Sequence, residues 1–125
     1  YNGMNTENKN IGKFIVVYDT IVDGELCHKN EDETPLLFDS HDEAFKEIFD
    51  DATSMLDGYS DHELKDYCEG VTPAMVQRMK ELNSGTDVEA MKQFMKENPQ
   101  CNYNDEFVLP AEGFVDGRKA IFTGN

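Results

Sequence analysis

Apolar residues in the middle of the chain recur at helical spacing and predict four helices. The clearest pattern covers residues 41–56, where apolar positions form one stripe with the helical period of about 3.6 residues. The members of this stripe are Ala44, Phe45, Ile48, Phe49, Ala52, Met55 and Leu56. We therefore expect an amphipathic helix that buries one face.

Capping signals mark where the predicted helices begin. Residues 40–43 and 60–63 both have the Ser-x-x-Glu pattern, in which the serine hydroxyl and the glutamate carboxylate each accept a hydrogen bond from a free backbone amide. Thr72 stands before Pro73 at a third start, because proline suits the first helical turn. Residues 86–89 give a fourth start, with Thr86 as the expected cap.

Both ends of the chain instead have the pattern of strands. Residues 13–22 are apolar on both faces, which favours a central strand, and the Asp-Gly turn at residues 23–24 leads to a returning strand at residues 25–29. Residues 35–38 form either a short third strand or a lead-in to the first helix. Residues 106–109 and a second hairpin at residues 114–122 repeat the strand pattern.

These elements predict a small α+β fold. We expect one antiparallel sheet, built from the N- and C-terminal hairpins, with three or four helices packed on one face. The chain of 125 residues has room for one domain and one core, which we place at residues 13–125. Residues 1–12 lack periodicity, so we expect a disordered or tag-derived segment there.

The charge of the chain excludes some classes of partner. Asp and Glu number 26 against 11 for Lys and Arg, which gives a net charge of −15. Direct nucleic-acid binding and docking on anionic membranes both need an excess of basic residues. No apolar run approaches the roughly 18 residues of a membrane span, and three widely spaced cysteines do not suggest a disulfide framework. We expect a cytoplasmic protein.

Most of the excess acid lies between residues 39 and 70, which contain eleven acids and two bases. The candidate partner-binding residues are Asp39, Asp42, Glu43, Glu47, Asp50 and Asp51. Carboxylates four residues apart on a helix stand about 6 Å from each other, much like successive phosphates of a DNA strand. The acidic stretch is therefore either a solvated face or a functional anionic surface that fits a basic groove.

Other chemistry has weak support in the sequence. Cys27, Cys68 and Cys101 lack the paired spacing of zinc sites, and the EF-hand-like residues 19–24 lack the glutamate needed at the last loop position. No nucleophile elbow or phosphate-binding loop is present. His41 and His62 each follow a capping serine. We predict no catalytic, cofactor-binding or metal-binding residue.

Four methionines form two helical pairs. Met75 with Met79, and Met91 with Met95, are each four residues apart. We expect them to pack in the core; the alternative is an adaptable groove for a partner helix.

Our functional prediction is a non-catalytic acidic module that binds a protein. It would act as an inhibitor or regulator that presents its anionic helix face to a basic partner. The alternative is a small enzyme or ligand-binding domain with a pocket between sheet and helices. A histidine, His28 or His62, beside a buried carboxylate would favour that alternative. Self-association through the edge of a hairpin is a third class.

Overall fold

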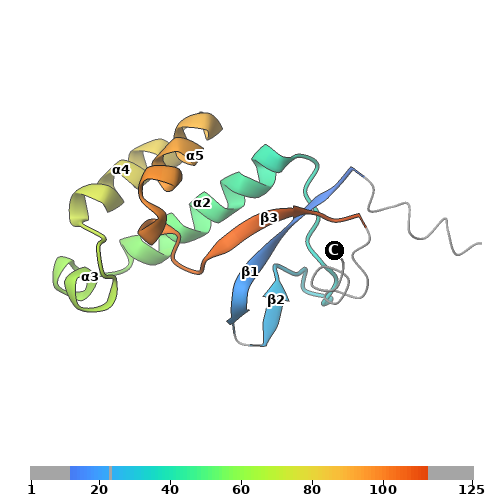
Figure 1. Cartoon of the computed structure of the whole chain (residues 1–125), viewed down its shortest axis with the longest axis horizontal. Coiled ribbons are helices and arrows are strands. Elements are labelled where there is room, and N and C mark those ends of the chain that lie inside the picture. The colour runs from blue at the N-terminus through green and yellow to red at the C-terminus, as the bar shows by residue number, and fades with distance from the viewer. Residues whose placement is uncertain (1–11, 23, 113–125) are drawn as a thin grey trace, which may run out of the picture. The chain divides into compact units, whose positions relative to one another are not determined.

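The computed structural model describes residues 12–22 and 24–112. Its elements in chain order are β1 (Phe14–Val22), β2 (Glu25–Cys27), α2 (His41–Asp57), α3 (Asp61–Tyr67), α4 (Pro73–Asn83), α5 (Val88–Glu97), a 3-10 turn η1 (Pro99–Cys101) and β3 (Glu106–Pro110) (Figure 1). The predicted α+β class with an antiparallel sheet is confirmed. The second predicted hairpin at residues 114–122 lies outside the described residues, as does the predicted N-terminal segment apart from Gly12.

The chain divides into two compact units. Of the described residues, the sheet unit contains 12–22, 24–44 and 106–112, and the helical unit is Phe45–Asp105. Each unit has a core of its own. Among the described helices, none is long and apolar enough to cross a membrane.

Strand β1 is the middle strand of the described sheet, as its pattern predicted. It pairs antiparallel with β3 in an unbroken register from Phe14–Pro110 to Tyr18–Glu106. Its pairing with β2 shifts between Val17 and Val22, an irregularity that the sequence did not indicate. Ile15, Val16 and Val17 are completely buried, so both faces of β1 are covered. Pro110, which cannot donate a backbone hydrogen bond, lies at the end of the edge strand β3.

The chain after β2 forms a lead-in to α2, the second of the two predicted alternatives. Strand β2 ends at Cys27, two residues earlier than predicted. Phe38 joins β1 through a pair of backbone hydrogen bonds with Phe14, of 2.8 and 2.9 Å. The intervening loop turns at Glu33, which has a positive φ of 73°. A proline at residue 35 also removes one backbone donor, so this stretch makes isolated bridges rather than a strand.

A histidine–carboxylate pair spans the sheet. His28 Nε2 lies 3.1 Å from Glu106 Oε2, and the Glu106 side chain is only 2% exposed. Tyr18 of β1 pairs in register with Glu106, and its ring lies 5.4 Å from the His28 ring. The pair therefore links the residue after β2 to the first residue of β3, across β1. Because the partners are 78 residues apart in the chain, no local pattern could predict it.

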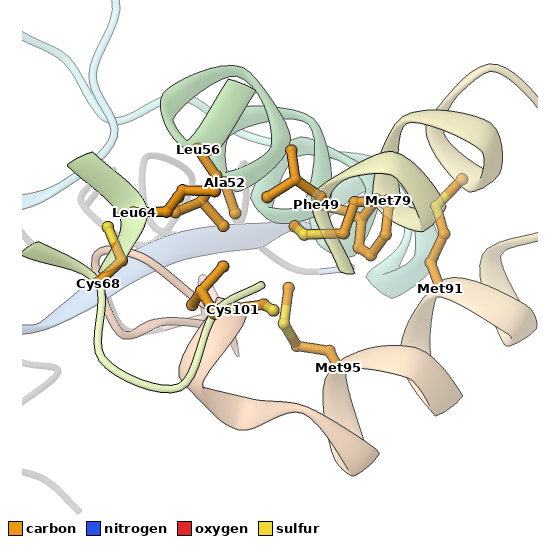
Figure 2. Packing of buried hydrophobic residues seen from close by; sticks show 11 residues of the cluster. Phe49, Ala52, Leu56, Leu64, Cys68, Met79, Met91, Met95 and Cys101 are labelled. Atoms are coloured by element: carbon orange, nitrogen blue, oxygen red, sulfur yellow. The ribbon is translucent and has the colours of Figure 1, made fainter. Parts of the chain in front are cut away.

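The helical unit has a core rich in sulfur-containing side chains. Its buried members are Phe49, Ala52, Leu56, Leu64, Cys68, Val71, Val76, Met79, Met91, Met95 and Cys101 (Figure 2). Met79, Met91 and Met95 are buried, which confirms the core interpretation for these three, and Met75 packs against the same core while half-buried. The rings of Phe49 and Phe94 meet edge to face at 6.1 Å, an arrangement that aromatic pairs favour.

The caps confirm most predicted helix starts and correct one. Ser60 and Glu63 make the complete reciprocal capping box of α3, and the Thr72 hydroxyl accepts from the Met75 amide at α4. The cap of α5 is Asp87 rather than Thr86, with its carboxylate accepting from the Ala90 amide at 3.0 Å. Aspartate is at least as good a cap as threonine, so shifting the start by one residue costs little.

Two methionines test how much the helical core depends on packing. We expect Met79→Ala, at a fully buried site, to lower the free energy of unfolding by about 2–5 kcal/mol because it leaves a cavity. Met55→Ala is the matched control, since this side chain is 42% exposed; its effect should stay within about 0.5 kcal/mol. Urea unfolding measures both, and similar losses would contradict the assigned core.

Candidate interaction surface

Helix α2 carries five of the six predicted partner-binding residues and is amphipathic as predicted. Ala44, Ile48, Phe49, Ala52 and Leu56 are at most 4% exposed. Met55 is a correction to the predicted stripe, since it lies at the stripe's edge and remains exposed. Thr53 is buried instead, and its hydroxyl donates to the Phe49 carbonyl at 2.7 Å, which satisfies it within the helix.

Three acids lie on the side opposite the buried stripe. Glu43, Glu47 and Asp50 are separated by four and three residues, so they are neighbours on one side of the helix. Glu43 and Asp50 are exposed, and Glu47 is half-buried. We call these three residues the anionic face. Asp42 stands one residue before Glu43, which places it about 100° around the helix from that residue. Asp51 is four residues after Glu47 and so borders the face, but its side chain is half-buried beside Asn104.

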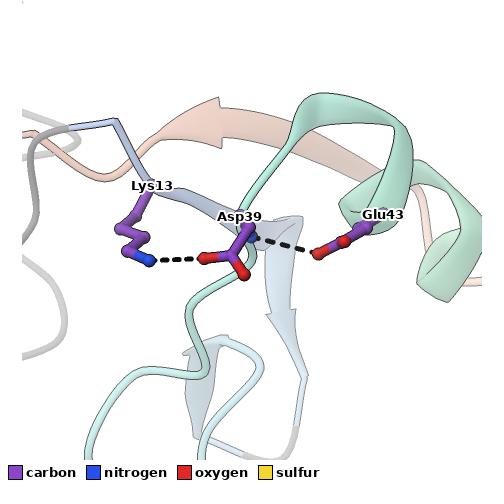
Figure 3. A network of polar contacts seen from close by, with 3 residues as sticks. All are labelled: Lys13, Asp39 and Glu43. Carbon is purple, nitrogen blue, oxygen red and sulfur yellow. Dashed lines mark hydrogen bonds and ion pairs between the residues drawn. The ribbon is translucent and has the colours of Figure 1, made fainter.

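The first turn of α2 uses two of the predicted acids for its own structure. The Ser40 hydroxyl accepts from the Glu43 amide at 3.1 Å, as the capping signal predicted. The Glu43 carboxylate reaches back to the Asp39 amide at 3.2 Å, one residue earlier than in the box of α3. Lys13 in turn bonds to the Asp39 carboxylate (Figure 3). Asp39 is therefore already paired with a base and lies outside the anionic face.

Asp50 is held by the end of helix α4. Its carboxylate accepts from the Asn83 side-chain amide at 2.9 Å. Lys46 donates to the Asn83 side-chain oxygen at 3.0 Å and to its backbone oxygen at 3.3 Å. An ammonium at a helix C-terminus complements the partial negative charge of the last carbonyls. Lys46 is four residues from both Asp42 and Asp50, yet its hydrogen bonds are with Asn83.

Asp51 and Asp42 differ in their surroundings. Asp51 is half-buried, and the Asn104 side-chain amide lies 3.5 Å from its carboxylate. Asp42 is exposed in the first turn, where the helix dipole stabilises negative charge. The six predicted residues thus divide into a three-membered face and three residues with other neighbours.

The sequence did not predict that three tyrosines lie close together. Tyr59 and Tyr103 join through their hydroxyl oxygens at 2.6 Å, and the Tyr67 ring lies 6.4 Å from that of Tyr59. The hydrogen bond with Tyr103 raises the pKa of Tyr59 to about 12. The only available signal was three aromatic residues near predicted helix ends, and nothing in it indicated that residues 59 and 103 meet.

The three cysteines are buried, and the exposed His62 is paired within its own helix. Cys27 is buried in the sheet unit, and Cys68 and Cys101 are buried in the helical core. Burial raises the pKa of all three thiols, that of Cys101 to about 11, so the protonated form is favoured. His62 is exposed and lies 3.1 Å from Asp66 on the next turn of α3.

No family model, curated protein or solved structure matches this chain.

Two variants test whether the Ser40 hydroxyl or the Glu43 charge stabilises the start of α2. We expect Ser40→Ala to lower the free energy of unfolding by about 1 kcal/mol, because the Glu43 amide loses its acceptor. Glu43→Gln should lower it less, since glutamine also serves at this capping position and only the interaction of the charge with the helix dipole is lost. Urea unfolding measures both variants. A loss with Glu43→Gln as large as with Ser40→Ala would mean that the carboxylate charge, rather than the bond, supports the helix.

Proposed function

We propose that this protein is an acidic interaction module whose anionic face on α2 binds a basic surface of a protein partner, as an inhibitor or regulator. The observation that supports this most is the side-by-side placement of Glu43, Glu47 and Asp50 opposite the buried stripe of one helix. A rigid helix holds such carboxylates at fixed spacing, so little conformational freedom is lost on binding.

The charge balance favours the same interpretation. The stretch from residue 39 to residue 70 has eleven acids and two bases, and the chain as a whole carries −15. Such a field speeds encounter with a basic partner and repels acidic ones. Lys46, the one base within the α2 sequence, donates to Asn83 at the end of α4.

Neutralising the anionic face tests the proposal. We expect the triple variant Glu43→Gln, Glu47→Gln, Asp50→Asn to lose at least about tenfold in affinity for the partner, because three attractive charges disappear. The partner is first captured from extracts of the source cell at about 0.1 M salt, identified by mass spectrometry and purified. Binding should also fall at about 1 M salt, where the Debye length shrinks from about 10 Å to about 3 Å.

The matched control removes three exposed acids from α4 and α5. Glu81, Glu89 and Glu97 of α4 and α5 are exposed, and changing each to glutamine alters the net charge by the same amount. This control should bind like the wild type. If it loses as much affinity as the α2 variant, only net charge matters and the face has no special role. Equal binding by all three proteins would refute the proposal.

A second candidate rests on the His28–Glu106 pair. An imidazole beside a buried carboxylate is a common acid–base arrangement, so this observation favours a small enzyme or ligand-binding domain. The same pair also has the structural role of linking the sheet across β1. Adding the low-mass fraction of a cell extract while recording the His28 ring resonances separates the candidates: a ligand shifts them, and a basic protein partner of α2 does not.

A further inference from the structure

Tyr67 is an unusually exposed aromatic side chain. It is the last residue of α3 and is 72% exposed, against 42% for Met55 and 38% for Phe107, the other exposed large apolar residues of the described chain. Tyrosine has an apolar ring with a negatively polarised face, and it is enriched among the residues that dominate protein interfaces. An exposed ring of this kind is a candidate contact for a partner.

The Tyr67 ring lies beside Tyr59, a side chain that is itself held in place. Tyr59 lies 6.4 Å from Tyr67 between ring centroids, with 40° between the planes, and is hydrogen-bonded to Tyr103. Tyr59 and Tyr103 both pack against the core of the helical unit. Tyr67 therefore rests against a side chain that is itself anchored, which reduces the entropy lost when a partner binds.

A carboxylate lies on the same side of α3 as the Tyr67 side chain. Glu63 precedes Tyr67 by four residues, so the two side chains lie on the same side of α3. The hydrogen bond with Tyr103 is the main cause of the raised pKa of Tyr59, and the negative charge of Glu63 is the smallest of its causes. One oxygen of Glu63 accepts from the Ser60 amide at 2.9 Å, and a carboxylate has further lone pairs for another donor.

The surroundings of this pair are negative. Residues 57–69 contain five acids and a single base, Lys65. Lys65 is two residues from both Glu63 and Tyr67, a spacing that does not face either one on a helix. Asp66 is paired with His62, whereas Glu63 lies one helical turn before Tyr67 on the same side of α3.

We propose that Tyr67 and Glu63 together form a docking surface for an arginine side chain of a protein partner. A guanidinium is planar and stacks on an aromatic face while its N–H groups donate to a carboxylate at the edge. Lysine carries the same charge as a compact, strongly hydrated ammonium and makes the stacked contact less well. The surface thus discriminates between two residues of equal charge. It lies on α3 and does not depend on the anionic face of α2.

Two capped pentapeptides, Gly-Arg-Gly-Arg-Gly and Gly-Lys-Gly-Lys-Gly, serve as probes of equal charge. Titrations of the full chain are followed by NMR, through amide resonances of α3 and ring resonances of the tyrosines. We expect the arginine peptide to bind about two- to fivefold more tightly than the lysine peptide, the range of an exposed cation–π contact. The largest shifts should fall at Tyr67 and Glu63.

Variants separate the contribution of the Tyr67 ring to peptide binding from that of the Glu63 charge. Tyr67→Phe should keep the preference for arginine, and Tyr67→Ala should remove it. Glu63→Gln, which still suits the capping position, should weaken both peptides, whereas the matched control Glu89→Gln in the first turn of α5 should change neither. The α2 triple variant should retain the arginine preference, so this proposal can fail or succeed separately from the proposed function.

Three results would overturn the docking surface. One is equal affinity of the wild type for the two peptides, and another is an unchanged preference in Tyr67→Ala. The third is a shift of the Tyr67 resonances with protein concentration in the absence of peptide, because a second copy of the chain would then cover the ring.

Discussion

The burial of one broad apolar stripe on α2 determines how the rest of the helical unit is arranged. Phe49, Ala52 and Leu56 enter a core that α4 and α5 complete with Met79, Met91 and Met95 (Figure 2). Burying a large apolar side chain contributes about 1.5–3 kcal/mol, which greatly exceeds the few tenths of a kcal/mol involved in a surface charge pair. The apolar residues therefore set the rotation of the helix, and the acids on its other side point outward as a consequence.

The acids of α2 stand where their cost is partly offset. Asp42 and Glu43 gain from the dipole at the helix start, and Glu43 also satisfies a backbone amide. Asp50 lies towards the C-terminal half, where the dipole gives no help, and there the Asn83 amide donates to it. The Lys46 ammonium donates to the Asn83 backbone oxygen at the end of α4. These bonds hold Glu43 and Asp50 in place on the helix.

Local signals predicted the helices well because a helix is stabilised by residues close in sequence. Ser40, Ser60 and Thr72 all cap where the pattern indicated, and the one shift, to Asp87, exchanges one good cap for another. The contacts that the sequence missed join residues far apart in the chain. The His28–Glu106 pair spans 78 residues, and the Tyr59–Tyr103 bond spans 44. Neither has a periodicity or spacing that a single sequence displays.

The two proposed surfaces would contribute differently to one binding event. Exposed carboxylates act over a Debye length and so mainly raise the rate at which a basic partner arrives. An anchored aromatic ring acts only at contact, where it slows dissociation and is much less sensitive to salt. A partner that presents arginine in a basic patch would meet the long-range charge of α2 and the short-range ring of α3. Lysine in the same patch would gain from the first and little from the second, so the ring gives selectivity that net charge alone cannot provide.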